Sequence, residues 1–189
     1  ADASVAAFGA SLDRVDVLVN NAGIAFGAES LAASVDDKWR AMFELNVLGV
    51  LRMTRTLLPK LIASGDGLIV NLGSIAGVET YPGGGGYAAS KHAAHALTRT
   101  LRLELLGQPV RITEILPGLA ETEFALVRFD GDRERAKKVY EGMTPLTAED
   151  IAEAVRWVAT LPAHVDIDEI VIRPRDQATT MLVHRRPKE

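Results

Sequence analysis

The sequence predicts an α/β fold, in which helices cover both faces of a doubly wound parallel sheet. Two observations support this prediction. Short apolar runs rich in β-branched residues alternate along the chain with longer segments whose apolar residues repeat at helical spacing. The chain also has 189 residues, of which 48% are hydrophobic and 24% charged, a composition that suits one globular domain with a sizeable core. Residues 1–189 are therefore expected to form a single domain.

Four apolar runs are expected to be strands, and small or polar residues follow the first three of them. The runs are residues 15–19, expected to be a buried strand, and residues 67–72, 110–116 and 169–172. The first run is followed by Asn20 to Gly23, the second by Ser74, and the third by Pro117 and Gly118. Ligands of helix-covered parallel sheets bind beyond the carboxyl ends of the strands, so these three segments are expected to converge on one edge.

The segments between these strands carry helical patterns. Residues 34–64 hold two such patterns, and residues 87–106 form one long helix. A last helix begins at Thr147, with Asp150 completing a capping box. The long helix is expected to bury its small and aliphatic residues, namely Ala89, Ala93, Ala96, Leu97 and Leu101. Residues 121–141 are polar and mixed, so they are expected to form a mobile segment that covers the sheet edge.

Tyr87 and Lys91 are candidates for acid–base chemistry. They are four residues apart at the start of the long helix, so they share one helix face, a turn apart. A free tyrosine has a pKa of about 10 and is a poor acid or base at neutral pH, but a fixed ammonium nearby favours the phenolate and lowers that pKa. Ser74 can hold a substrate oxygen beside the phenol. Such a pair is by itself common on helix surfaces, and its place at the convergent edge favours a proton-transfer site for an alcohol or a carbonyl.

Composition and charge exclude several classes of site and partner. The net charge is −4 and no basic patch interleaves with aromatic residues, so nucleic acid is not an expected partner. No cysteine is present, which excludes disulfides and thiolate sites. The histidines at 92, 95, 164 and 184 lack metal-ligand spacing with carboxylates, so no metal site is expected, and His92 and His95 are assigned to a helix surface. No apolar run of eighteen residues and no signal peptide is seen, so we expect a cytoplasmic protein without a membrane partner.

Five motifs, in this order, resemble those of the short-chain dehydrogenase/reductase family. They are Asn20-Asn21-Ala22-Gly23, Asn46, Ser74, Tyr87-x-x-x-Lys91 and Pro117-Gly118. The resemblance implies a Rossmann-like fold and hydride transfer between NAD(P) and an alcohol or a carbonyl. Tyr87 would then give or take the proton, while Lys91 lowers its pKa and holds the nicotinamide ribose. Ser74 would orient the substrate oxygen. Asn46, which alone would be interpreted as a satisfied core residue, would support a water-linked proton relay to Lys91.

The resemblance also assigns contacts with cofactor and substrate. The residues implied for the cofactor are Asn20, Ala22, Gly23, Tyr87, Lys91, Pro117, Gly118, Leu119 and Thr122. Ser74 is expected to bind substrate. For Arg128 the same role is a hypothesis from its position, in a segment expected to fold over the active-site edge: its guanidinium would bind a carboxylate in a two-pronged contact, strengthened by the apolar neighbours Val127 and Phe129. The alternative interpretation of Arg128 is a surface arginine paired with Asp130 or Asp132.

Further motifs resemble one branch of that family, the NADP-dependent serine and 3-hydroxy acid dehydrogenases. They are Glu123-Phe124, Val127-Arg128-Phe129 with Gly131-Asp132, and the run from Thr160 to Val165. This resemblance implies NADP as the cofactor, with NAD not excluded, and a small hydroxy acid or carbonyl compound as the substrate. Members of the branch are usually tetramers, so a homo-oligomer, a tetramer or a dimer, is expected.

One departure from the family pattern concerns the start of the chain. The family begins with a strand and a glycine-rich turn, Thr-Gly-x-x-x-Gly-x-Gly, and this sequence contains no such turn. We therefore expect an amino-terminally truncated, Rossmann-like sheet, the carboxyl-terminal portion of a family member. The residues that select NAD or NADP would lie in the absent part, and the chain by itself is not expected to bind NADP tightly.

Two alternatives to a 3-hydroxy acid dehydrogenase remain open. One is a short-chain reductase that acts on another ketone or aldehyde. The other is a non-catalytic relative used for binding or assembly. The presence of Asn46, Ser74, Tyr87 and Lys91 together argues against the second, because a binding role does not require all four.

Overall fold

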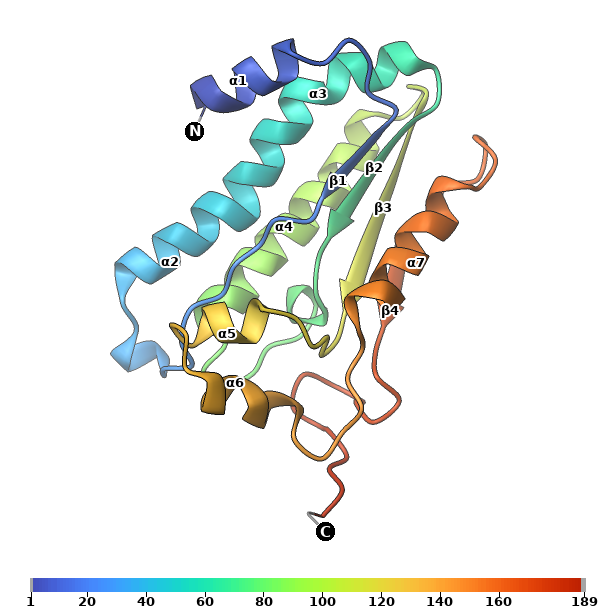
Figure 1. Ribbon diagram of the computed structural model, residues 1–189. Helices are drawn as coiled ribbons and strands as arrows, with labels where there is room; N and C mark the ends of the chain where they lie inside the picture. Colours follow the sequence, from blue (N-terminus) through green and yellow to red (C-terminus); the bar gives the residue numbers. More distant parts are fainter. Residues whose placement is uncertain (1, 188–189) are drawn as a thin grey trace.

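The computed structural model describes residues 2–187, which contain one sheet of four parallel strands (Figure 1). The strands are β1 (Val17–Asn20), β2 (Gly67–Leu72), β3 (Val110–Pro117) and β4 (Glu169–Ile172). They lie side by side in sequence order, and each pairs in parallel with the next. The predicted parallel α/β sheet with a Rossmann-like arrangement is confirmed, and all four strands lie within two residues of their predicted bounds.

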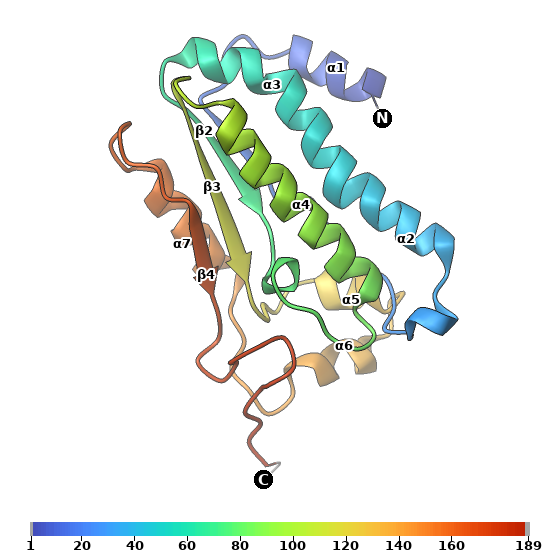
Figure 2. The same cartoon turned by 180° about the vertical axis from the view of Figure 1, so that it is seen from behind.

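Helices connect the strands and cover the sheet. They are α1 (Asp2–Ala10), α2 (Asp36–Phe43), α3 (Val50–Ser64), α4 (Gly85–Glu104), α5 (Phe124–Arg128), α6 (Arg133–Tyr140) and α7 (Ala148–Ala159). Two short 3-10 helices, η1 (Leu31–Ala33) and η3 (Ile75–Gly77), lie in loops, and a π-helical turn, η2 (Glu44–Gly49), joins α2 to α3. Figures 1 and 2 show α3 and α4 on one face of the sheet and α7 on the other. No helix within residues 2–187 has both the length and the apolar character needed to cross a membrane.

Two apolar clusters, one on each face of the sheet, form the core. The first joins β1, β2 and β3 to α3 and α4 through buried residues that include Leu18, Leu61 and Ile112. The second joins β2 and β3 to α7, where Val158 packs on the sheet. The predicted capping box begins α7, because the Thr147 side chain accepts from the Asp150 amide and the Asp150 carboxylate accepts from the Thr147 amide.

The prediction of a buried first strand is wrong for one face of β1. Leu18 is buried, but Val17 and Val19 are 44% and 40% exposed. These two side chains alternate with Leu18 and therefore point to the opposite face, which no helix among the described residues covers at this strand.

The predicted buried face of the long helix is wrong in part: Ala89, Ala93, Leu97 and Leu101 are half-buried, and Leu101 packs against the first apolar cluster. α4 buries small and polar residues, namely Gly86, Ala88, Ser90, Lys91, Ala94 and Thr98. Ala96, which was assigned to the core, is exposed. Hydrophobicity misled the prediction because Ser90, Lys91 and Thr98 are buried by hydrogen bonds to partners on other elements or on the helix backbone.

Candidate active site

The segments that follow β1, β2 and β3 meet the start of α4 at one edge of the sheet, as the sequence predicts. Ser74 lies directly beyond β2, 9% exposed, and its hydroxyl accepts a hydrogen bond from the amide of Ala76 at the start of η3. Tyr87 and Lys91 lie on the first turns of α4. The Ser74 side chain also lies close enough to the Tyr87 phenol to lower its pKa. The structure thus brings three of the four predicted catalytic side chains into one cluster.

Gly23 brings Asn46 and Lys91 together. A Cβ placed on Gly23 would lie 3.5 Å from Asn46 Oδ1 and 3.5 Å from Lys91 Nζ, so both side chains face this glycine. Lys91 Nζ donates to the carbonyl of Leu72 at 2.7 Å, which fixes the ammonium at the end of β2. The ammonium lies 5.9 Å from the centre of the Tyr87 ring. The loop after β1 therefore passes directly over the polar atoms of the cluster.

Asn46 is 1% exposed, and both polar atoms of its amide are hydrogen-bonded within the protein. Its Oδ1 accepts from the Ile24 amide at 2.8 Å, and its Nδ2 donates to the Ile24 carbonyl and to Ser90 Oγ, both at 2.9 Å. The residue sits in the π-helical turn η2, a conformation often found at functional sites. Asn46 thus clamps the loop after β1 to α4.

Burial opposes ionisation of both Tyr87 and Lys91. It raises the pKa of Tyr87 to about 12, and the nearby Ser74 side chain lowers that pKa by less. It lowers the pKa of Lys91 to about 8, and the charge of Glu114 opposes this effect. The expectation that Lys91 brings the Tyr87 pKa below its usual value is therefore wrong for this chain, because burial of the phenol outweighs the lowering effects of Ser74 and Arg128.

Asn20 was expected to contact the cofactor, but its side chain points into the protein. Its Nδ2 donates to Thr54 Oγ1 at 3.2 Å and to Asn71 Oδ1 at 2.8 Å, and Asn71 Nδ2 donates to Thr98 Oγ1 at 2.9 Å. This buried network ties β1 and β2 to α3 and α4. Further along the same loop, Ala22 is exposed and Gly23 is half-buried.

The segment Pro117–Thr122 continues from β3 along the same edge. Gln177, which is 5% exposed, holds it, because Gln177 Oε1 accepts from the Leu119 amide at 2.8 Å. A Cβ on Gly118 would approach that oxygen to 2.3 Å, so a larger residue here would displace the Gln177 side chain. Thr122 is exposed, and its hydroxyl accepts from the Phe124 amide. Sequence reasoning missed Gln177, because an isolated glutamine in a polar tail carries no signal.

The expected mobile segment forms α5 and α6, and α5 packs over the cluster. The Phe124 ring lies 5.4 Å from the Tyr87 ring at an angle of 59°. Beside Tyr87, residues of the loop after β1 and of α2 line a hollow together with the glycine run before α4. The apolar side chains around it include Phe26, Leu31 and Trp39.

Arg128 does not pair with Asp130 or Asp132, so the alternative interpretation of a local surface pair is wrong. Its Nε donates to the Gly27 carbonyl at 2.9 Å, its Nη1 to the Tyr81 hydroxyl at 3.0 Å, and its Nη2 to the Gly83 carbonyl at 3.3 Å. The guanidinium therefore joins α5 to the loop after β1 and to the glycine run before Tyr87. Val127, which was expected to shield Arg128, is 46% exposed.

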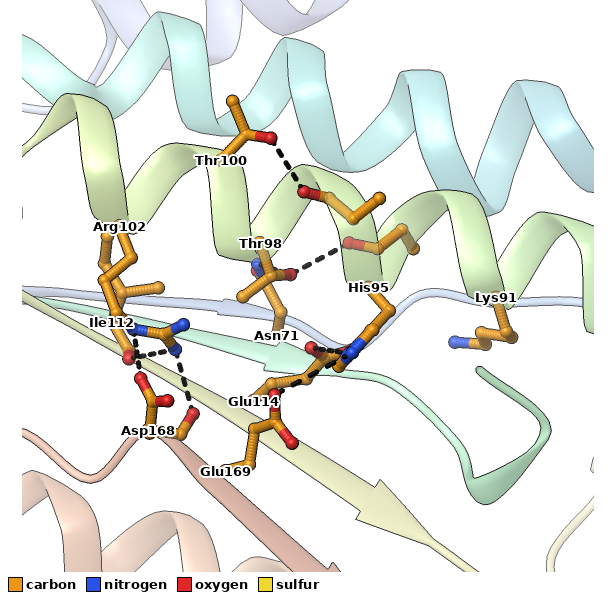
Figure 3. A network of polar contacts seen from close by, with 12 residues as sticks. Asn71, Lys91, His95, Thr98, Thr100, Arg102, Ile112, Glu114, Asp168 and Glu169 are labelled. Carbon is orange, nitrogen blue, oxygen red and sulfur yellow. Dashed lines mark hydrogen bonds and ion pairs between the residues drawn. The ribbon is translucent and has the colours of Figure 1, made fainter. Parts of the chain in front are cut away.

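His95 was assigned to the helix surface and is instead turned toward the sheet (Figure 3). Its Nδ1 forms a 2.8 Å hydrogen bond with Glu114 Oε2, and its Nε2 lies 3.8 Å from Glu169 Oε1. One ligand atom of each of the three residues lies within 4.8 Å of the others, but His95 already uses Nδ1 for its hydrogen bond with Glu114, and Glu169 approaches only as an ion-pair partner. We call His95, Glu114 and Glu169 the helix–sheet cluster. No spacing rule finds it, because its members come from α4, β3 and β4.

Comparison with known proteins identifies the family. The model described as short chain dehydrogenase matches residues 1–132. An uncharacterized oxidoreductase of Mycobacterium tuberculosis is 64% identical over 81% of this chain and 61% of its own length. The chain thus spans about three fifths of that relative. A sulfoacetaldehyde reductase of Chromohalobacter salexigens is 46% identical over 94% of this chain and 70% of its own length.

Two further proteins carry the names of the predicted branch. An NADP-dependent 3-hydroxy acid dehydrogenase of Salmonella typhimurium is 49% identical over 90% of this chain and 70% of its own length. A serine dehydrogenase solved in its closed form with NADP+ superposes with a TM-score of 0.92 at 42% identity, covering 98% of this chain and 77% of that one. Matched by the family model over most of its length, and sharing both sequence and fold with these relatives, the chain belongs to the short-chain dehydrogenase family.

Proposed function

We propose that the protein containing this chain is an NADP-dependent oxidoreductase that transfers hydride between the cofactor and a small 3-hydroxy acid or the corresponding aldehyde. The observation that carries this proposal is the meeting of Ser74, Tyr87 and Lys91 at the carboxyl ends of the parallel strands, with Lys91 and Asn46 both facing Gly23. The names of the similar 3-hydroxy acid and serine dehydrogenases support the cofactor and the substrate class.

The described residues fit the nicotinamide-ribose end of NADP. Gly23 leaves the backbone open in front of Lys91 and Asn46, and a side chain there would fill that space. Lys91 Nζ has three donors, of which one is used by Leu72, so donors remain for ribose hydroxyls. Gly118 and Leu119, held by Gln177, would form the opposite wall.

In this proposal the bound cofactor supplies the hydride, and the side chains of the chain handle the proton. In the direction of reduction, the phenol of Tyr87 donates its proton to the carbonyl oxygen while Ser74 Oγ hydrogen-bonds the same oxygen. A protonated Tyr87 suits this role, since burial raises its pKa to about 12. The Lys91 ammonium stabilises the phenolate that remains. Asn46 holds the loop that carries Gly23 and so keeps this pocket in shape.

Arg128 is the proposed contact for the acid group of the substrate. It reaches from α5 to the glycine run that precedes Tyr87, so a substrate beside the phenol lies within the region it clamps. A carboxylate could replace Tyr81 or Gly83 as an acceptor and would give a stronger, charge-assisted bond. Because a sulfonate presents similar oxygens, reduction of sulfoacetaldehyde is the second candidate function, favoured by the similar reductase of Chromohalobacter salexigens.

Steady-state assays of the intact protein test the proposal. NADPH oxidation is followed with malonic semialdehyde, with sulfoacetaldehyde and with uncharged propanal, beside Tyr87→Phe and Lys91→Met variants. We expect the highest kcat/KM with one of the two anions and loss of turnover in both variants. Turnover that survives both variants, or a preference for propanal, would contradict the proposal.

We also propose that the protein assembles as a homo-oligomer. Leu103 and Leu106, which are 78% and 89% exposed, are candidate contacts between subunits, and analytical ultracentrifugation tests this assembly.

A further inference from the structure

A carboxylate lies buried behind the active site. Glu114 is 1% exposed and points from β3 toward α4. Its Oε2 is bound by His95, while its Oε1 would be 2.5 Å from a Cβ placed on Gly73. Gly73 is the residue between Leu72, whose carbonyl accepts from Lys91, and Ser74. The carboxylate and the Lys91 ammonium therefore contact adjacent residues at the end of β2.

His95 follows Lys91 by four residues on α4, so the two side chains leave the same face of the helix, a turn apart. Figure 3 shows both directed from α4 toward the sheet, with Glu114 between the helix and β4. Among the described residues, the charged or titratable groups that face Glu114 are His95 and Lys91 from α4 and Glu169 from β4. Lys91 in turn faces Glu114 and the ring of Tyr87.

We propose that Glu114, held by His95, is a positioning residue that acts as the counter-charge of Lys91 and keeps its ammonium charged inside the protein. Burial works against that ammonium and brings the Lys91 pKa to about 8, and the charge of Glu114 acts in the opposite direction. This inference rests on the proposed function, because a charged Lys91 matters to the reaction through Tyr87.

His95 has a definite part in this arrangement. Glu114 and Glu169 are register partners on neighbouring strands, where two like charges repel. Burial raises the pKa of Glu114, Glu169 raises it further, and the hydrogen bond from His95 lowers it. His95 thus favours the carboxylate form of Glu114, and through Glu114 the charged form of Lys91.

The test is the Glu114→Gln variant of the intact protein, with lysine labelled with 13C at the ε carbon. The Lys91 signal, assigned with Lys91→Arg, is titrated by NMR. We expect its pKa to fall by about one unit, as removal of a nearby opposite charge predicts. The alkaline limb of kcat for carbonyl reduction should move by the same amount, so that the loss is about tenfold at pH 9 and small at pH 6. Glu114→Asp, which keeps the charge, should restore most of the wild-type profile.

Asp166→Asn is the matched control. Asp166 is an exposed carboxylate near the other end of β3, where it accepts from the Ile112 amide at 3.0 Å, and an asparagine oxygen can do the same. This variant should leave the Lys91 titration unchanged.

The outcomes separate the inference from the proposed function. A shifted Lys91 titration in a protein without reductase activity would keep the inference about charge and reject the function. A Tyr87-dependent reductase whose Lys91 titration and alkaline limb are the same in wild type and Glu114→Gln would overturn the inference. Should Glu114→Gln not fold, His95→Gln carries the test, with a smaller shift in the same direction expected and an unchanged titration overturning it.

Discussion

At the scale of single residues, Tyr87 and Lys91 share one environment that disfavours charge on either. The pKa values of about 12 and about 8 are set mainly by burial against the sheet. A neutral phenol beside an ammonium is the state ready to donate a proton to a carbonyl. The reverse reaction, which removes a proton from an alcohol, first needs the phenolate and is therefore favoured by alkaline conditions.

Replacing Tyr87 with phenylalanine should remove most turnover of the intact protein and leave its affinity for NADPH nearly unchanged. The proton of the phenol matters only as charge develops on the substrate oxygen, so the loss should appear in kcat, by about 100- to 10,000-fold. Single-turnover kinetics and a fluorescence titration with NADPH measure the two quantities. Near-normal turnover would remove Tyr87 from the reaction.

The rate of carbonyl reduction should fall as the pH rises through about 8, the pKa of Lys91. Below this value the side chain carries its charge and stabilises the phenolate that forms on Tyr87, and above it that charge is lost. The measurement is kcat at saturating NADPH between pH 6 and pH 9.5. In Lys91→Arg, whose guanidinium stays charged, any remaining activity should show no such fall. A wild-type rate independent of pH over this range would contradict the assigned role of Lys91.

Arg128→Lys should weaken catalysis on anionic substrates selectively. The loss should correspond to about 1.5–3 kcal/mol, the range for hydrogen bonds to charged groups, since lysine cannot copy a two-pronged contact. The comparison is kcat/KM for malonic semialdehyde and for propanal. Arg128 also joins α5 to Gly27 and Gly83, so a purely structural role would lower both values equally. Equal losses would therefore leave Arg128 as a clamp without a part in substrate choice.

At the scale of elements, the turn after β2 is tightly packed, so that a side chain at Gly73 would collide with neighbouring side chains. A Cβ on Gly73 would lie 2.5 Å from both Glu114 Oε1 and Leu116 Cδ2. Gly73→Ala should therefore destabilise the protein by about 1–3 kcal/mol, as overpacking of a core does. Gly107→Ala is the comparison for backbone strain, since it has a positive φ of 85° but no atom within 4 Å of its Cβ. Urea unfolding measures the free energy of unfolding of both variants. A Gly73→Ala variant as stable as wild type would show that the Glu114 side chain can move away freely.

The sequence predicted these elements well where periodicity or capping chemistry decides their position. β2 and β4 have the predicted bounds, and Thr147 begins α7 as expected. Prediction from the sequence failed where a side chain is buried because it hydrogen-bonds polar partners on distant segments. Lys91 and Thr98 look like surface residues of a helix, and His95 gave no sign of the carboxylates on β3 and β4. The catalytic cluster could be located because its residues follow the strands, whereas Gln177 and Glu114 act through contacts that only the fold creates.

At the scale of the whole molecule, carboxylates tie the carboxyl-terminal segment to the body. Glu79 accepts from the Thr180 amide and from Arg173, both at 2.7 Å, and these contacts lower its pKa. Asp176 accepts from the Thr144 amide at 3.2 Å and from Arg186 at 2.7 Å, which lowers its pKa in the same way. A lowered carboxylate pKa means stability that is present above the unfolded pKa and lost as the pH falls through the folded one.

Residues 173–187 should therefore loosen first on acidification below about pH 4, the ordinary range of carboxyl groups. Hydrogen exchange, corrected for its intrinsic pH dependence, measures this against the core strand β3. The double variant Glu79→Gln, Asp176→Asn should show the faster exchange already at neutral pH. If the segment and β3 exchange together at every pH, these carboxylates do not hold the segment separately.

The π-helical turn at Glu44–Gly49 has a consequence for insertions and deletions. Such a turn contains one residue more than an α-turn, so α2 and α3 together behave as one long helix carrying a tolerated insertion. Deleting a single residue there would let the helix run on regularly, and it would rotate everything on one side of the deletion by about 100° relative to the other. Asn46 would then leave Ile24 and Ser90. An active protein should therefore require the exact length of this segment as well as the asparagine at position 46.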